Sequence, residues 1–249
     1  MEHIVVGLND VSLNYHERSG ETPAVEHLSM QVKSGEFVSV VGPSGCGKTS
    51  VLSLIAGIIE PSSGRITIND CKTGYMLQRD HLLDWRNIEG NVLLGLEVHK
   101  SLNEETRSAA LGLLDTYGLS SFARHYPRQL SGGMRQKVAL IRTLATSPDV
   151  LLLDEPFSSL DYQTRLRLSD EVFDIIKKEH KTAVLVTHDI AEAISMSDRV
   201  LVFSRRPAHV KSEHLITLSH GVTPISRRNA PEFKDYFDAI WKELDIGEA

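Results

Sequence analysis

The sequence has little cysteine and no long apolar segment. Its two cysteines, Cys46 and Cys71, show neither paired spacing nor neighbours of metal-ligand type. We therefore expect no structural disulfide, and a reducing cytosol is the simplest setting. The longest apolar runs, such as VLLLD at 150–154, fall far short of the roughly 20 residues needed to cross a membrane. The N-terminus has no basic segment followed by an apolar one, so we also expect no signal peptide.

Positive charge is also in short supply, since 27 lysine and arginine residues face 33 aspartate and glutamate residues and leave a net charge of −6. Proteins that bind duplex DNA by neutralising its phosphates need a local excess of positive charge. Nucleic acid is therefore disfavoured as a partner. The 249 residues suit one large domain, or a core with an inserted subdomain.

Short apolar segments alternate with helical ones along most of the chain. The runs at 36–42, 149–156, 182–189 and 199–204 are typical of buried parallel strands, whereas 4–15 and 26–35 alternate partly, as half-exposed strands do. From about Arg79 to Thr146 the pattern is helical. We expect an α/β fold with a mainly parallel sheet, an N-terminal antiparallel β subdomain and an inserted helical subdomain of roughly 65 residues. The expected boundaries are 1–79 and 147–215 for the core, 80–146 for the helical subdomain and 216–249 for a C-terminal helical tail.

The tail contains a segment, PEFKDYFDAIWKEL at 231–244, that is typical of an amphipathic helix. Pro231 suits a first helical turn. One face would carry the apolar residues Phe233, Tyr236, Phe237, Ile240, Trp241 and Leu244. A helix docked on its own domain is favoured, and a partner-binding helix is the alternative.

The segment GPSGCGKT, residues 42–49, matches the phosphate-binding pattern G-x-x-x-x-G-K-[ST] between a predicted strand and a predicted helix. Its glycines allow backbone N–H groups to turn toward phosphate oxygens, and the helix N-terminus adds a favourable dipole. Lys48 can reach the β- and γ-phosphates, and the Thr49 hydroxyl can ligate Mg²⁺. This predicts a P-loop NTPase core whose nucleotide-binding residues are Gly42, Pro43, Ser44, Gly45, Cys46, Gly47, Lys48, Thr49 and Ser50. An ordinary glycine-rich turn with a chance lysine is the disfavoured alternative.

Two carboxylates follow the apolar strand VLLLDEP at 150–156, at the strand end where α/β sheets bind ligands. Asp154 would orient or hydrate Mg²⁺. Glu155, one residue on, points differently and can polarise an attacking water as general base. Without a P-loop such residues would more often be helix caps or solvated groups, but the P-loop favours the catalytic interpretation.

A second phosphate-facing segment, LSGGMRQ at 130–136, carries no lysine. Ser131 precedes Gly132 and Gly133, and a helical run follows. A serine hydroxyl and exposed N–H groups at a helix start can bind an anion without a lysine. The alternative is an N-capped helix with no ligand.

The order GPSGCGKT, LSGGMRQ, LLLDEP, SSLD and VTHD resembles the nucleotide-binding subunit of an ABC transporter, over residues 3 to 215. The resemblance implies that Tyr15, at the expected end of its strand, stacks on adenine. It implies that Gln78 links the Mg²⁺ and water site to the helical subdomain, and that His188 contacts the γ-phosphate and the catalytic water. Asp161 would lie in a loop crossing a dimer interface, and capping the next helix is a compatible role.

The same resemblance implies how the second segment works. Two copies would pack head to tail around ATP and Mg²⁺, with Ser131 and Gly133 of one copy facing the γ-phosphate held by Lys48 of the other. A single copy would then be a poor ATPase. The implied partners are a second copy, membrane permease subunits and, indirectly, a solute-binding protein, with no nucleic acid. The implied location is peripheral, at the cytoplasmic face of the cell membrane.

The segment LQRDHLLDWRNIEGNVLLGLE at 77–97 resembles importer subunits for nitrate, sulfonates, taurine and pyrimidine precursors of thiamine, as does VFSRRPAHV at 202–210. Asp84 departs from that group, which commonly has proline there. Leu82, Leu83 and Trp85 would form either a hydrophobic socket for a permease helix or ordinary core. Only 52 residues separate Gln78 from Ser131, which leaves no room for the coiled coil of DNA-repair relatives. A soluble ABC ATPase acting on nucleic acid or ribosomes is the alternative function.

Overall fold

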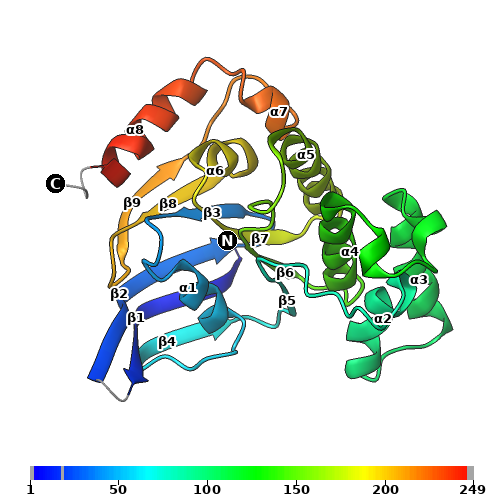
Figure 1. Ribbon diagram of the computed structural model, residues 1–249. Helices are drawn as coiled ribbons and strands as arrows, with labels where there is room; N and C mark the ends of the chain where they lie inside the picture. The colour runs from blue at the N-terminus through cyan, green and yellow to red at the C-terminus, as the bar shows by residue number, and fades with distance from the viewer. Residues whose placement is uncertain (1–2, 18–19, 246–249) are drawn as a thin grey trace.

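Residues 3–17 and 20–245 are described by a computed structural model of the chain, which contains two β-sheets with helices around them (Figure 1). The smaller sheet is antiparallel, with the order β2-β1-β4. Its strands are β1 (Ile4–Glu17), β2 (Gly20–Lys33) and β4 (Ser63–Ile68). Burial alternates along β2, so one face is apolar and the other meets solvent. The expected N-terminal antiparallel part is confirmed.

The larger sheet has the order β5-β6-β7-β3-β8-β9. Its strands are β3 (Phe37–Val41), β5 (Thr73–Met76), β6 (Val150–Asp154), β7 (Thr182–Thr187), β8 (Arg199–Phe203) and β9 (Val210–Leu215). All pairings are parallel except β8 with β9. Every residue of β3, β6, β7 and β8 is buried, as strands covered on both faces require. The mainly parallel sheet is confirmed.

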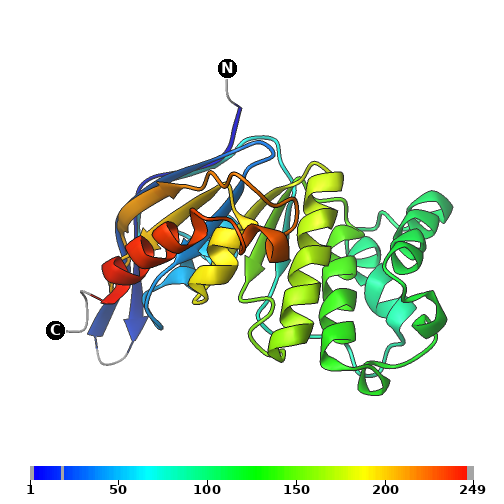
Figure 2. The same ribbon diagram turned by 90° about the horizontal axis from the view of Figure 1, so that it is seen from above.

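Helices cover both faces of the parallel sheet (Figures 1 and 2). Helix α1 (Lys48–Ile55) lies between the two sheets and shares one core with them, in which Leu52 and Val40 are fully buried. Helices α4 (Gly132–Leu144) and α5 (Tyr162–Lys178) pack on the opposite face, where Leu140 and Val172 meet Leu151 of β6. The sheet is therefore held between two apolar layers, which fixes the positions of its strand ends.

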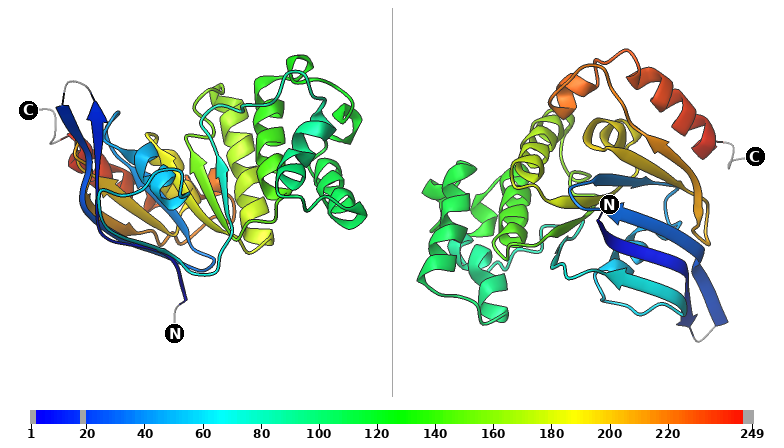
Figure 3. Two further views of the ribbon diagram at one scale, coloured as in Figure 1. Left: turned by 90° about the horizontal axis from the view of Figure 1, so that it is seen from below. Right: turned by 180° about the vertical axis from the view of Figure 1, so that it is seen from behind.

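A group of helices projects from the end of the molecule away from the antiparallel sheet (Figure 3). It contains α2 (Ile88–Val98), α3 (Glu104–Thr116) and α4, with 3₁₀ turns at Ser120–Phe122 and Pro127–Gln129. Val92, Leu114 and Val138 belong to its separate core. Asn103 caps α3 by accepting the Thr106 N–H. Helix α4 belongs both to this core and to the core on the parallel sheet, so it joins the helical group to the sheet.

The C-terminal part contains α6 (Ile190–Met196), α7 (Pro224–Arg227) and α8 (Phe233–Asp245). Helix α8 packs on α6 and β8 through Ile240, which is fully buried. Trp241 is 54% exposed and stacks on Phe237. The tail helix thus docks on its own domain. It begins two residues after Pro231, which therefore precedes the first turn, and its Trp241 side chain is exposed to solvent. Within the described residues, none of the helices combines the length and apolar character needed to cross a membrane.

Two glycines give a matched test of this packing. A Cβ on Gly74 in β5 would lie 2.7 Å from Thr143 Cγ2 of α4, whereas a Cβ on Gly112 in α3 would meet nothing within 4 Å. Gly74→Ala should lower the free energy of unfolding by about 1–3 kcal/mol through overpacking. Gly112→Ala should raise it by about 0.5–1 kcal/mol, because alanine loses less entropy in a helix. Urea unfolding of both variants checks the pair, and changes of the same sign would contradict it.

Candidate functional site

The candidate site lies at the carboxyl ends of three neighbouring strands, β3, β7 and β6. Val41 pairs with Thr187, and Asp154 pairs with Val186, so the three strands end at nearly the same level. This edge is where open α/β sheets bind their ligands. The segments that follow these strands carry the P-loop, His188 and Glu155.

Residues 42–47 form the loop between β3 and α1. Gly45 and Gly47 have φ values of +74° and +120°, which L-residues with side chains rarely adopt. A Cβ on Gly47 would also lie 2.7 Å from the backbone oxygen of Ala24. The glycines are therefore needed for the tight path of the loop, as the motif predicts.

Lys48 is the first residue of α1 and is almost fully buried. Its Nζ donates hydrogen bonds to the backbone oxygens of Gly42, at 2.7 Å, and Pro43, at 2.9 Å. The ammonium group is thus held over the loop by neutral acceptors, and its charge can act on an anion. The Cys46 side chain is buried in the core between the two sheets and does not face the loop's anion site. This burial raises the pKa of its thiol.

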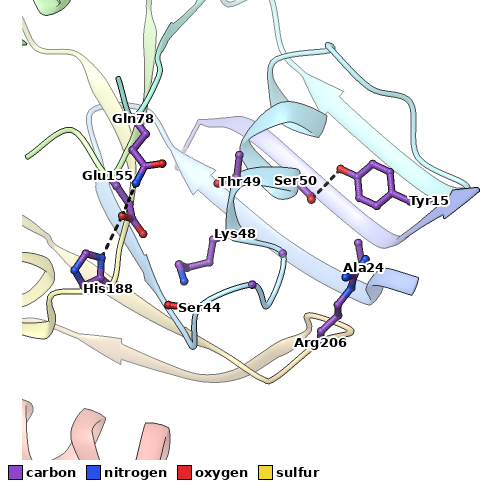
Figure 4. A pocket seen from close by; sticks show the side chains of 12 residues that line it. Tyr15, Ala24, Ser44, Lys48, Thr49, Ser50, Gln78, Glu155, His188 and Arg206 are labelled. Atoms are coloured by element: carbon purple, nitrogen blue, oxygen red, sulfur yellow. Dashed lines mark hydrogen bonds and ion pairs between the residues drawn. The ribbon is translucent and has the colours of Figure 1, made fainter. Parts of the chain in front are cut away.

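A cavity of about 510 Å³ opens beside this loop (Figure 4). Its volume lies in the range of small-molecule sites. It is lined by Tyr15, Ala24, Ser44, Gly45, Gly47, Lys48, Thr49, Ser50, Gln78, Glu155, His188 and Arg206. One cavity therefore collects residues from seven separate parts of the chain.

A smaller cavity of about 250 Å³ adjoins the first and shares Ser44 and His188 with it. Its remaining lining residues are Gly42, Pro43, Ile190, Trp241 and Leu244. The C-terminal helix thus forms an apolar wall beside the P-loop. Gly42, Pro43 and Cys46, although they belong to the predicted loop, do not line the main cavity.

Asp154, the last residue of β6, is 4% exposed. It accepts hydrogen bonds from Thr49 Oγ1 at 3.1 Å and from the Tyr75 hydroxyl at 3.3 Å. Burial raises the pKa of Asp154, and these two hydrogen bonds oppose the rise. Burial also raises the pKa of Tyr75 to about 12, so this phenol remains a neutral donor. Sequence reasoning missed Tyr75, which reaches Asp154 only because β5 pairs with β6.

Glu155 points toward two other polar side chains, Gln78 and His188 (Figure 4). Its Oε2 accepts a hydrogen bond from Gln78 Nε2 at 3.1 Å and lies 3.2 Å from His188 Nδ1. The φ of Glu155 is +42°, a strained conformation for a residue with a side chain. Backbone strain of this kind clusters at functional sites. Three predicted catalytic residues thus meet from separate segments of the chain.

Tyr15 lies at the mouth of the cavity, 38% exposed, with its hydroxyl 3.0 Å from Ser50 Oγ. The expectation that Tyr15 ends its strand is wrong, because β1 continues to Glu17 through pairing with β2. The ring nevertheless offers an apolar face at the edge of the cavity. Such a face suits stacking on a base.

The residues of the second phosphate-facing segment lie outside this cavity. Ser131 caps α4, its hydroxyl accepting the Met134 N–H at 3.3 Å, and Gly132 and Gly133 form the first turn. Asp161 caps α5 in the same way through the Thr164 N–H at 3.0 Å. A single chain therefore does not bring Ser131, Gly132, Gly133 or Asp161 to Lys48.

The body of α4 is nevertheless tied to the cavity by its side chains. Gln136 Nε2 donates to the backbone oxygen of Gln78 at 3.4 Å, and Arg135 Nε donates to Asp80 at 3.0 Å. Arg142 donates to the backbone oxygens of Asp80 and His81. The helix that begins at Ser131 thus holds the segment that presents Gln78, a link that sequence reasoning missed.

Trp85 is 75% exposed, so it is not part of the core of the helical group. Leu82 packs against that core, and Leu83 is held by Asn91, whose Oδ1 accepts the Leu83 N–H at 2.7 Å. Asp84 is exposed beside Trp85. An ordered loop therefore presents a large aromatic side chain to solvent.

Comparison with known proteins assigns this architecture to a family. The family model described as ABC transporter matches residues 25–158. The chain is 48% identical, over 96% of its length and 95% of the relative, to the uncharacterized ABC transporter ATP-binding protein YtlC of Bacillus subtilis. It is 37% identical to the nitrate import ATP-binding protein NrtD of Synechocystis, covering 94% and 92% of the two chains. It is 42% identical to the taurine import ATP-binding protein TauB of Yersinia pestis, covering 76% of each.

The fold agrees with solved structures as well. A dimeric structure of the ATP-binding cassette MJ0796, in a post-hydrolysis state with ADP and Pi, aligns with a TM-score of 0.74 and 30% identity. The alignment covers 85% of this chain and 99% of that one. The α/β architecture with two sheets is therefore the ABC cassette fold.

Arg206 and Ala24 line the cavity and were not predicted as site residues. Arg206 is anchored by its Nε, which donates to the Pro23 backbone oxygen at 2.9 Å. Its terminal nitrogens remain as donors on the side of the cavity occupied by Ala24 and Tyr15 (Figure 4). The segment 202–210 resembles importer subunits, but that resemblance predicts no binding role for Arg206.

We expect Arg206→Gln to weaken ATP binding by about 3- to 10-fold. This loss of affinity is smaller than that expected on removing a buried charged hydrogen bond, because the Arg206 side chain is exposed. Arg205→Gln is the matched control, since Arg205 is the exposed neighbour and does not line the cavity. Titration with a fluorescent ATP analogue measures both dissociation constants. Equal affinities for the two variants would remove Arg206 from the binding site.

Proposed function

This chain belongs to the ABC transporter family as an ATP-binding subunit with ATPase activity, and we propose that it couples ATP hydrolysis to solute import through a membrane permease. The observation that carries the proposal is the meeting of Gln78, Glu155 and His188 in the cavity that also contains Lys48 and Thr49. A water activator lies beside a phosphate-binding loop, as phosphate hydrolysis requires.

The polar groups fit ATP with Mg²⁺. Thr49 and Asp154 place hydroxyl and carboxylate oxygens together, which are ligands that Mg²⁺ prefers. Gln78 directs its amide nitrogen at Glu155, so its carbonyl oxygen is the atom able to serve as a third ligand. When bound, Mg²⁺ supplies positive charge to the phosphate oxygens. Lys48 would add a second positive charge, since its ammonium group is held by backbone carbonyl groups.

In the proposed reaction, Tyr15 stacks on adenine and the loop at 42–49 binds the phosphates through its N–H groups. Glu155 accepts a proton from water as the water oxygen attacks the γ-phosphorus, and the bond from that phosphorus to the bridging oxygen breaks. His188 holds the water and the γ-phosphate in line beside Glu155. Positioning of this kind supplies most of the rate in phosphoryl transfer.

The site is completed by a second copy. Ser131, Gly133 and Asp161 lie outside the cavity of their own chain. Ser131 and Gly133 lie at a helix start, which is suited to an anion. We infer that two copies pack head to tail, so that Ser131 and Gly133 of one face the γ-phosphate bound by the other. The dimeric form of the MJ0796 cassette with ADP and Pi supports this arrangement.

The solute and the other partners follow from the relatives. Two relatives are import proteins named for nitrate and taurine, so we propose a small solute of the nitrate, sulfonate, taurine or pyrimidine-precursor type. The exposed Trp85 next to the ordered Leu82–Leu83 segment suits a socket for a permease helix. The chain would then work at the cytoplasmic face of the cell membrane, held there by the permease, with a solute-binding protein acting on the far side.

Glu155→Gln tests the general base. The amide keeps the shape of the side chain but cannot take the proton, so ATP turnover should fall by about 100-fold or more while ATP binding persists. A closed dimer should accumulate with ATP, and size-exclusion chromatography detects it. Glu179→Gln, at an exposed helix end far from the cavity, is the control. A turnover rate equal to that of the wild type would refute the assignment.

Ser131→Arg tests the contribution of the second copy. In the Glu155→Gln background, the bulky arginine should abolish ATP-dependent dimerisation and leave ATP binding by single chains mostly intact. The same substitution at the exposed Ser108 of α3 should leave the dimer unchanged. Sedimentation with and without ATP distinguishes them, and loss of ATP binding by the monomer would count against a role across the interface.

A further inference from the structure

His188 lies in the turn between β7 and α6, and the residue before it is fixed by two hydrogen bonds. Thr187 is 1% exposed. Its hydroxyl donates to Glu192 Oε2 at 2.7 Å and accepts the Asp189 N–H at 3.1 Å. The hydroxyl of Thr187 thus connects the residue after His188 to a carboxylate one helical turn further on.

Glu192 also binds the other side of the turn. Its backbone N–H donates to Asp189 Oδ1 at 3.0 Å, which caps α6. The residues flanking His188 are therefore both tied to Glu192, one through its side chain and one through its backbone. The His188 side chain itself is 53% exposed and reaches Glu155.

The Asp189 side chain, which caps α6, also contacts a residue of helix α5. Arg165 of α5 lies with Nη1 3.3 Å from Asp189 Oδ2, and its Nη2 donates to the backbone oxygen of Leu160 at 3.3 Å. Leu160 immediately precedes Asp161, which lies outside the cavity. The turn that carries His188 is thus connected to the segment that would meet a second copy.

The buried Glu192 carboxylate lacks one of its hydrogen-bond partners within the described part of the chain. It is 3% exposed, and its Oε1 has no hydrogen-bond partner among the residues that the structure describes. Arg165 Nε and two nitrogens of Arg228 are likewise buried there without a partner. A buried carboxylate with an unsatisfied oxygen lowers the stability of the fold, so stability does not explain the presence of Glu192 at this position.

We propose that Glu192 is a positioning residue for His188, whose carboxylate fixes the turn through Thr187 and so holds the imidazole beside Glu155. This inference rests on the proposed roles of His188 and Glu155. It adds a second layer of residues, out of reach of the nucleotide, that sets the geometry of hydrolysis.

The arrangement makes hydrolysis sensitive to pH near neutrality. Burial raises the pKa of Glu192 to about 7; Asp189 adds to the rise, while the Thr187 hydrogen bond and the charges of Arg165 and Arg228 oppose it. Above that pH the carboxylate is ionised and accepts the Thr187 hydrogen bond more strongly. Below it, the protonated group holds the turn less firmly. The part of kcat that depends on Glu192 should therefore rise as the pH increases through about 7.

The test uses the full chain at a concentration high enough for maximal ATPase activity. Thr187→Val keeps the side-chain shape but removes both hydrogen bonds of the hydroxyl, and kcat should fall by about 10-fold or more with little change in KM for ATP. Thr182→Val, at the opposite end of β7, also removes a buried hydroxyl, which accepts the Gly35 N–H, and should leave kcat near the wild-type value. Glu192→Gln should remove the rise in kcat near pH 7.

Two results would overturn the inference: Thr187→Val with wild-type kcat, or Glu192→Gln with the wild-type pH profile. Should Thr187→Val fail to fold, as judged by circular dichroism, the pH profile of Glu192→Gln decides the matter. His188→Ala separates this inference from the proposed function. If His188→Ala keeps wild-type kcat, the role of His188 itself is wrong; if it loses activity while Thr187→Val does not, only the role of Glu192 fails.

Discussion

The parallel pairing of β6, β7 and β3 is the constraint on which the cavity depends, because Glu155, His188 and the P-loop directly follow these strands. Gln78 follows β5, which pairs with β6. Asp154 pairs with Val186, and Val41 pairs with Thr187, so three loops begin at the same edge. A slip of one residue in this register would exchange the two faces of a strand and turn Asp154 away from Thr49. Apolar layers on both faces of the sheet make such a slip costly.

Around this edge, the structure separates two acidic residues that are adjacent in sequence. Asp154 stays in line with β6, where Thr49 and Tyr75 bind both of its oxygens. Glu155 adopts a left-handed backbone conformation and turns toward Gln78 and His188. The strain at one residue thus lets neighbouring carboxylates face different ligands.

Local patterns were enough to predict the P-loop, the acidic pair, the cap at Asp161 and the docked C-terminal helix, since each depends on a few adjacent residues. Tyr75 and Arg206 could not be found in this way, because they reach the cavity through pairing with strands or loops distant in sequence. Glu192 was missed because its burial and the nearby charges of Arg165 and Arg228 are set by tertiary packing. The four-residue α7 is too short to show a periodic pattern, and β1 passes Tyr15 because its partner strand is equally long.

The two tryptophans of the chain lie in functionally different places. Trp241 borders the small cavity shared with Pro43, Ser44 and His188, and Trp85 is exposed on the helical group. Indole emission responds to the polarity and mobility of its surroundings. Replacing either tryptophan by phenylalanine would leave a single tryptophan, which is Trp241 beside the phosphate loop or Trp85 exposed on the helical group. The molecule thus contains two optical reporters, with which events at the phosphate loop and on the helical group can be timed separately.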